Sequence, residues 1–136
     1  MMEIAYDRLN SHELTGTTQT DYLVALDAHF MLIEDDTTIY DEPGFPVVEL
    51  ARSMVLWLRN PDNRDFIFDS MSYEEVGSVI IRQDALGWTF TSVFAPDAVT
   101  APIDRNEVER CCRSFVSRVE ADLWELGVDP DKVFRQ

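Results

Sequence analysis

Apolar residues recur every three or four positions between residues 108 and 126, and this pattern constrains the fold more than any other feature of the sequence. Such a stripe predicts an amphipathic helix that buries one face. Its members are Val108, Cys111, Cys112, Phe115, Val119, Leu123 and Leu126. Asp104 and Glu107 resemble a capping box at its start, and Gly127 is a natural stop at its end. We therefore expect one long helix over residues 104–126.

The two cysteines of the chain, Cys111 and Cys112, lie on this stripe. Neighbouring side chains on a helix point about 100° apart, so a structural disulfide between them is not expected. Both thiols should therefore pack in the core as small apolar groups. Free thiols are typical of a reducing compartment.

A second amphipathic helix is predicted after a break at residues 41–44. Pro46 suits the first turn of a helix, where its missing N–H has no cost. The Asn60-Pro61-Asp62-Asn63 segment is expected to end this helix. Its apolar stripe consists of Val47, Leu50, Ala51, Met54, Trp57 and Leu58.

Alternation of apolar and mixed positions predicts strands on both sides of this helix. Every even position from 22 to 32 is apolar, which predicts a long strand over residues 22–33 after a polar loop at 10–20. Further strands are expected at 3–9, 37–40, 66–68, 78–82 and 88–94, with a hairpin around 83–87. Trp88, Phe90 and Phe94 share one parity and should face the core. Near the C-terminus, Val133 and Phe134 are expected to pack back after a turn.

These elements follow the order β-β-β-α-β-β-β-α with short connections. That order predicts an α+β fold, in which a mostly antiparallel sheet of five to six strands has both helices packed on one face. Residues 1–136 are expected to form a single domain. The other sheet face, with Asp27, His29, Thr89 and Thr91, would then be open to solvent or to a partner.

The chain is strongly acidic, because 26 Asp and Glu residues against 11 Lys and Arg give a formal net charge of -15. Eighteen of the acidic residues lie in residues 1–100. Such a field attracts cationic partners and repels nucleic acids and anionic membranes. The alternative is that the acidity serves only solubility or reflects a salt-rich cytoplasm. The N-terminus lacks a signal-peptide pattern and no apolar run is long enough for a membrane span, which predicts a cytoplasmic protein.

The groups that catalysis requires are sparse. His12 and His29 are the two histidines, and the sequence contains no metalloprotease, nucleophile-elbow or phosphate-binding glycine motif. The carboxylate clusters lack the spacing of a calcium loop. We therefore expect no enzyme activity, no cofactor and no metal site.

Acidic residues beside aromatic ones form the clearest candidate for a binding surface. Carboxylates can pair with the cations of a partner while aromatic rings supply desolvated anchors. The candidate partner-binding residues are Glu34, Asp35, Asp36, Tyr40, Asp41, Glu42, Asp65, Asp69, Tyr73, Glu74 and Glu75. The alternative is that the aromatic residues belong to the core and the acids are the solvated ends of strands.

Three segments in the middle of the chain resemble small uncharacterised bacterial proteins that are grouped with the immunity proteins of toxin systems. They are Phe45-Pro46-Val47-Val48-Glu49-Leu50-Ala51 through Trp57-Leu58, Asp65-Phe66-Ile67-Phe68-Asp69-Ser70-Met71, and Gly87-Trp88-Thr89-Phe90-Thr91-Ser92-Val93. The resemblance implies a cytoplasmic protein that neutralises a cognate toxin, commonly a basic nuclease, by covering its active site. It implies no particular site residues.

Our leading hypothesis is therefore an immunity-type protein that binds a cationic toxin directly. A nucleic-acid mimic, with carboxylates in place of phosphates, is one alternative. A small-ligand carrier or enzyme with a pocket between the first helix and the sheet is another. A homodimer built through the open sheet face is a third.

Overall fold

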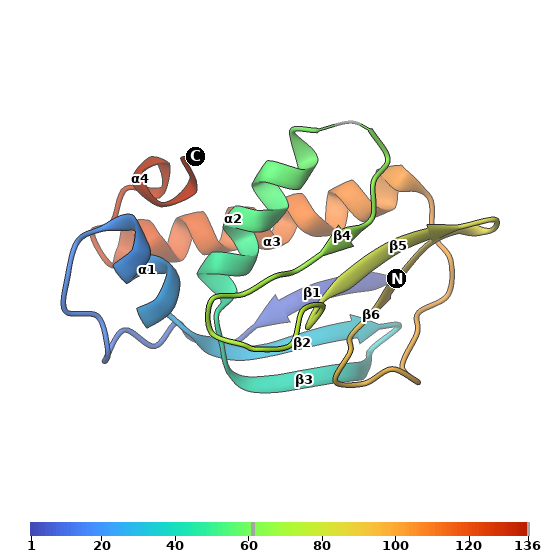
Figure 1. The fold of residues 1–136 in the computed structure, drawn as a ribbon, viewed down its shortest axis with the longest axis horizontal. Coiled ribbons are helices and arrows are strands. Elements are labelled where there is room, and N and C mark those ends of the chain that lie inside the picture. The colour runs from blue at the N-terminus through green and yellow to red at the C-terminus, as the bar shows by residue number, and fades with distance from the viewer. Residues whose placement is uncertain (61, 136) are drawn as a thin grey trace.

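The computed structural model describes residues 1–60 and 62–135, and Pro61, named above as part of a helix end, lies outside them. Strands and short helices precede the long helix of the C-terminal third (Figure 1). In chain order the elements are β1 (Met2–Tyr6), α1 (Gln19–Ala25), β2 (Ala28–Glu34), β3 (Thr37–Phe45), α2 (Val47–Leu58), β4 (Phe66–Ile67), β5 (Ile80–Asp84), β6 (Gly87–Thr91), α3 (Arg105–Glu125) and α4 (Pro130–Phe134).

The fold is α+β with antiparallel strand pairing, as predicted, but the strands form two sheets and not one. The first sheet has the order β1-β2-β3 and the second has the order β4-β5-β6. The expectation of five to six strands in a single sheet is therefore wrong. Helix α2 leaves the first sheet directly after Phe45, and the chain begins the second sheet only after crossing the molecule along that helix. In each sheet every strand pairs with its neighbour in the sequence, so three successive strands form one sheet on each side of α2.

The predicted strand over residues 22–33 is wrong in its first half, which forms helix α1. Thr18 caps this helix: its hydroxyl accepts from the Asp21 backbone N–H, and the Asp21 carboxylate accepts from the Thr18 N–H. Tyr22 and Leu26, which supported the alternation, are also four residues apart and fit one helix face. The strand begins at Ala28.

Strand β3 continues to Phe45 through the predicted break at residues 41–44. Its pairing with β2 is irregular between Ala28 and Phe30, where Phe45 and Glu42 are the respective partners. Pro43 and Gly44 lie in this irregular stretch of an edge strand, the place in a sheet where proline is tolerated.

The two predicted helices are confirmed as α2 and α3, and α1 and α4 are additional. Asp104 caps α3 by accepting from the Glu107 N–H, and Cys111 and Cys112 are buried free thiols. Helix α3 contacts β1 of the first sheet, β6 of the second, and α2. The stripe ends earlier than predicted, because Leu126 is exposed. Val133 and Phe134 are buried, as expected.

An aromatic cluster joins these elements in the core. The ring of Phe30 stacks on that of Phe45 with centroids 4.3 Å apart, and it meets Tyr40 and Phe115 edge-on. Phe45 in turn contacts Phe68 at 5.8 Å. The cluster therefore connects the first sheet and α3 to the segment that follows β4. None of the helices in the described residues is long and apolar enough to cross a membrane.

Candidate functional site

The chain between β4 and β5 forms a compact loop over residues 69–76. The loop is closed at its base, where the Gly77 N–H donates to the Phe68 carbonyl at 2.8 Å and the Phe68 N–H donates to the Val79 carbonyl at 2.9 Å. Gly77 has a φ of +97°, and a Cβ at this position would lie 2.9 Å from a methyl group of Val93. Glycine is therefore required for this closure.

A buried carboxylate holds the loop from beneath. Glu49, in the first turn of α2, is 6% exposed and accepts from the Ser70 hydroxyl at 2.6 Å and the Met71 N–H at 2.9 Å. The Ser70 oxygen also accepts from the Ser72 N–H. A carboxylate is favoured at a helix N-terminus, and the two hydrogen bonds compensate for its burial. The start of the loop is thus fixed to the helix.

Tyr73 anchors the middle of the loop. Its half-buried ring lies 5.8 Å from that of Phe45 and 5.6 Å from that of Phe94, measured between centroids. Burial raises the pKa of Tyr73 to about 12, and the charges of Glu42 and Asp27 act in the same direction. Glu42 comes from β3, so the ring brings residues of the loop and the first sheet together.

Tyr40 lies behind the same group. It is buried, and burial raises its pKa to about 12, with the nearby charges of Glu42 and Asp41 acting in the same direction. Its hydroxyl makes no hydrogen bond within the described residues. Tyr40 therefore supports the surface from the core and contributes little area to it.

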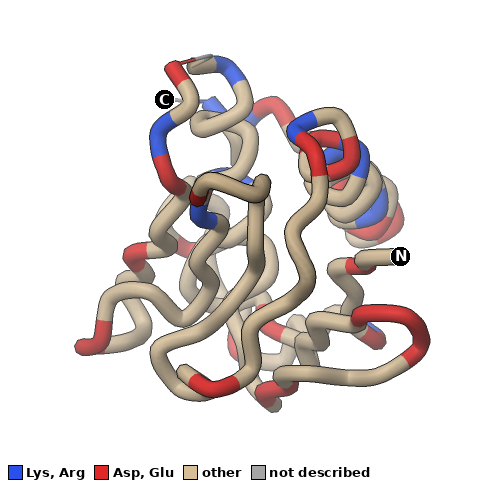
Figure 2. The backbone as a smooth tube through the Cα atoms, turned by 90° about the vertical axis from the view of Figure 1, so that its right-hand side faces the viewer, with Lys and Arg blue, Asp and Glu red and all other residues tan. Residues whose placement is uncertain are grey.

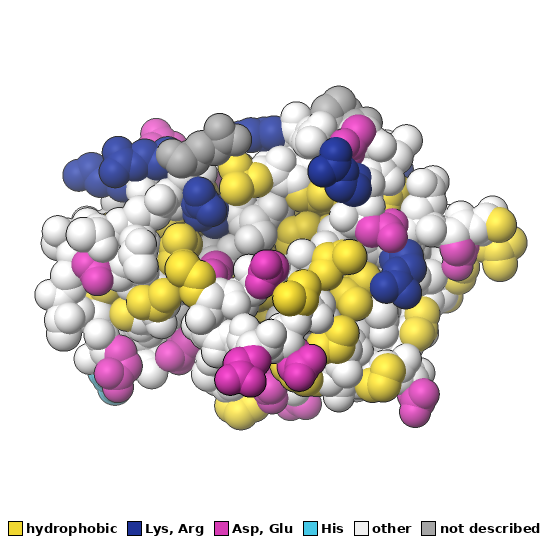
Figure 3. Space-filling model, viewed as in Figure 1, with side chains coloured by type: hydrophobic (Ala, Val, Ile, Leu, Met, Phe, Trp, Pro, Cys, Tyr) yellow, Lys and Arg dark blue, Asp and Glu magenta, His cyan; other side chains and the backbone are white. Residues whose placement is uncertain are grey.

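Apolar side chains are exposed next to these acids. Met71 is 57% exposed, Val76 50% and Phe94 42%. Glu74 and Glu75 lie between Met71 and Val76 in the chain and are also exposed. Figure 3 shows hydrophobic side chains on the face that carries β4 and β5, with Asp and Glu beside them. We call this the Tyr73 surface, defined by Glu42, Met71, Tyr73, Glu74, Glu75, Val76 and Phe94.

The predicted residues Glu34, Asp35 and Asp36 lie elsewhere, at the tip of the β2–β3 hairpin. Asp35 and Asp36 have φ values of 49° and 69°, as a two-residue hairpin turn requires. Asp35 pairs with the N-terminal ammonium group, and Glu34 accepts from the Ala101 N–H. Glu42 follows Asp36 by six positions along β3, a distance of roughly 20 Å at the usual rise. The tip is therefore a separate acidic region.

The remaining predicted residues divide between the loop and other places. Asp69 is exposed on the loop. Asp41 points to the other side of β3, where its carboxylate lies 2.9 Å from His29 Nε2. Asp65 accepts from the Gln83 N–H and lies 3.9 Å from Arg82. Of the eleven predicted residues, Glu42, Tyr73, Glu74 and Glu75 thus belong to the Tyr73 surface, and Tyr40 supports it from the core.

Sequence reasoning missed Glu49, Met71, Val76 and Phe94. Phe94 was expected in the core because it shares the parity of Trp88 and Phe90, but β6 ends at Thr91 and a turn at 92–95 reverses the alternation. An acidic residue amid the apolar start of a helix was the available signal for Glu49. For Met71 and Val76, the acidic residues between them were the one indication in the sequence that these side chains are exposed.

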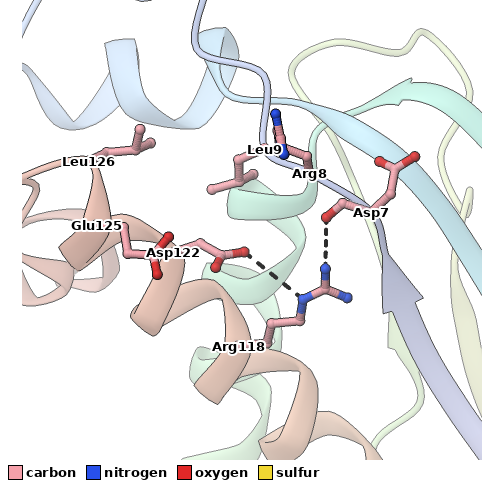
Figure 4. A pocket seen from close by; sticks show the side chains of 7 residues that line it. All are labelled: Asp7, Arg8, Leu9, Arg118, Asp122, Glu125 and Leu126. Carbon is pink, nitrogen blue, oxygen red and sulfur yellow. Dashed lines mark hydrogen bonds and ion pairs between the residues drawn. The ribbon is translucent and has the colours of Figure 1, made fainter.

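The hollow drawn in Figure 4, of about 500 Å³, lies between α3 and the segment after β1. Its lining includes Arg118, which donates to the Asp7 carbonyl at 2.8 Å and lies 4.0 Å from Asp122. The guanidinium also stacks over the Tyr6 ring at 4.1 Å, and the Tyr6 hydroxyl donates to Asp122. These polar groups satisfy one another and fasten α3 to β1.

Charge is unevenly distributed over the molecule. Figure 2 shows Lys and Arg on the helices and on the loops beside them, whereas the loops and strands at the other side carry mostly Asp and Glu. Among residues 1–60 and 62–135, no three His, Cys, Asp or Glu side chains are grouped as a metal site.

Alkaline pH should destabilise the protein through Tyr40 and Tyr73. Their pKa is about 10 when unfolded and about 12 when folded, so the native state holds protons that the unfolded state releases. Stability is therefore complete below about pH 10 and falls as pH rises toward 12. Urea unfolding across this range should show a falling midpoint. A Tyr40→Phe/Tyr73→Phe variant should show a smaller fall, and an equal fall would contradict the assignment.

Comparison with known proteins gives one match. No curated protein and no solved structure matches the chain. Residues 2–125 match a family model described as "Domain of unknown function (DUF7878)". Because this stretch includes every element from β1 to α3, the chain belongs to that family of unknown function.

Proposed function

We propose that this protein binds a cationic protein through the Tyr73 surface, and that the binding inhibits the partner in the manner of an immunity protein. The observation that carries the proposal is the exposure of Met71, Val76 and Phe94 beside Glu74 and Glu75. All of these except Phe94 lie on the 69–76 loop, which a buried carboxylate holds from beneath.

The composition of this surface suits a specific interface. Energetically important contacts come from apolar and aromatic anchors that become desolvated, with a polar rim around them. Here Met71 and Phe94 are the anchors, and Glu42, Glu74 and Glu75 form the rim. The net charge of -15 would speed the encounter with a basic protein and make it sensitive to salt.

Two alternatives explain less of this arrangement. Solubility accounts for exposed acids but not for exposed Met71 and Phe94 among them. A nucleic-acid mimic needs rows of free carboxylates, whereas Glu107 and Glu109 pair with arginines of α3. Protein binding accounts for both the acids and the apolar groups.

The proposal is tested with the basic protein that this chain captures at low salt, after that protein has been identified and purified. The quantity measured is the Kd of the complex. The Glu42→Gln/Glu74→Gln/Glu75→Gln variant should raise Kd at least about tenfold and flatten its salt dependence, since each rim charge lost weakens the attraction. The matched control is a Glu3→Gln/Glu13→Gln/Glu125→Gln variant, which makes the same change in net charge at exposed positions elsewhere. It should change Kd less than about threefold.

The anchors need their own variant. Met71→Ser/Val76→Ser/Phe94→Ser keeps the charge and should abolish both binding and suppression of the partner's activity, because it removes the desolvated centre. Equal weakening by the two glutamine variants would show that net charge alone drives association, and the proposed surface would be wrong. Tight binding that leaves the partner's activity unchanged would refute the inhibitory role while retaining the interface.

A further inference from the structure

A hollow lies at the opposite end of the molecule from the hairpin tip, where α2, α3 and α4 meet. Its volume is about 430 Å³. Val55 and Leu58 of α2, Val116 of α3 and Phe134 of α4 supply apolar lining. A second hollow shares Phe134 with it and continues past α4. The apolar lining is therefore part of a groove and not an isolated dimple.

Several basic residues lie around this groove, although the chain as a whole is acidic. Arg59 and Arg113 line the first hollow, and Arg59 and Arg135 line its continuation. Arg52, whose guanidinium donates to the Arg135 carbonyl, and Lys132 of α4 lie at the same end. Five of the 11 basic residues of the chain thus gather here, and Figure 3 shows dark-blue side chains along this edge.

Acidic residues lie among these cations, but they do not pair with all of them. Glu120 and Asp131 are the acidic residues in the lining, and Glu109 lies 3.3 Å from Arg113. Arg59 makes no ion pair with any described residue, and its side chain is exposed. At least one guanidinium is therefore free for an anion at the rim.

We propose that this groove binds a small molecule with an apolar body and a single anionic group, such as a medium-chain carboxylate. The apolar body lies on Leu58, Val116 and Phe134, and the carboxylate pairs with Arg59 and Arg113. A volume of about 430 Å³ is within the size range of small-molecule sites. Arginine forms paired hydrogen bonds with carboxylates, which gives this rim its selectivity.

This inference does not depend on the proposed function, because it uses other elements and relies on arginines and not on carboxylates. No residue of the Tyr73 surface lines the groove. Failure of one proposal therefore leaves the other standing.

Amide chemical-shift mapping by NMR of the full chain tests the proposed groove. Decanoate is the probe, and decanol is the uncharged control. Decanoate should shift the amide signals of residues 55–59, 113–120 and 131–135 in a saturable way, and decanol should bind at least about tenfold more weakly. Saturable shifts centred elsewhere, or equal binding of the two probes, would overturn the proposal.

Variants assign the two parts of the site. Arg59→Gln/Arg113→Gln should reduce decanoate affinity at least about fivefold and leave decanol unchanged, since only the charged group is affected. Arg64→Gln/Arg82→Gln, which removes two arginines outside the groove, is the matched control and should behave as wild type. Leu58→Ala, at a half-buried position, should weaken both probes. Unchanged decanoate binding in the double arginine variant, with a native amide spectrum, would refute the rim's role.

Discussion

Replacing Glu49 with alanine should lower the free energy of unfolding by about 2–4 kcal/mol, because the Ser70 hydroxyl and the Met71 N–H would lose a charged acceptor in a buried place. The gain from no longer burying a carboxylate offsets part of this loss, but the two donors left behind remain poorly hydrated. Urea unfolding of the variant measures the change.

Glu49→Gln separates the hydrogen bonds from the charge. Glutamine keeps one acceptor oxygen and nearly the same shape, so about half of the alanine effect is expected. Both variants should also weaken partner binding, since the Met71 end of the loop would no longer be held. Glu120→Ala, at a half-buried acid of α3 with no recorded hydrogen bond among the described residues, is the control and should change stability little. Equal stability of Glu49→Ala and wild type would contradict the role of Glu49 in holding the 69–76 loop.

Replacing Phe30 with alanine should lower the free energy of unfolding by about 3–5 kcal/mol, as truncation of a fully buried aromatic ring leaves a cavity. The ring contacts Tyr40 and Phe45 of β3 and Phe115 of α3, so β2 would lose packing against both elements at once. That loss is a large fraction of the stability of an ordinary domain.

The neighbouring residue provides the control. Met31 lies on the other side of β2 and is half-exposed, so Met31→Ala should cost about 1 kcal/mol or less. Thermal unfolding of both variants under identical conditions checks the difference. Comparable destabilisation by the two substitutions would mean that the core does not lie on the Phe30 side of the sheet.

Local sequence patterns predicted most of the elements. The stripes of α2 and α3 repeat over several turns, so few other structures could bury them together. The region 22–33 was ambiguous, because Tyr22 and Leu26 fit both a strand and a helix, and the Thr18–Asp21 cap decided for the helix. The strands before α2 do not pair with those after it, and so they form two sheets. Local sequence patterns do not indicate which distant strands pair.

The candidate site was predictable only in part. Acids and aromatics near Tyr73 were visible in the sequence, but the length of β3, which separates them from the acids at the hairpin tip, became clear only in the structure. Phe94 had the parity of a core residue, and its exposure follows from the turn after β6.

The acidity, the two amphipathic helices α2 and α3 and the antiparallel strands could all be predicted from the sequence, because each follows from composition or from a local period. The tertiary structure alone decided that Glu49 is buried beneath the 69–76 loop, that Met71 and Phe94 emerge beside Glu74 and Glu75, and that arginines from three helices share one groove. These are contacts between residues far apart in the chain. They arise only when burial of the common core brings the separate elements together.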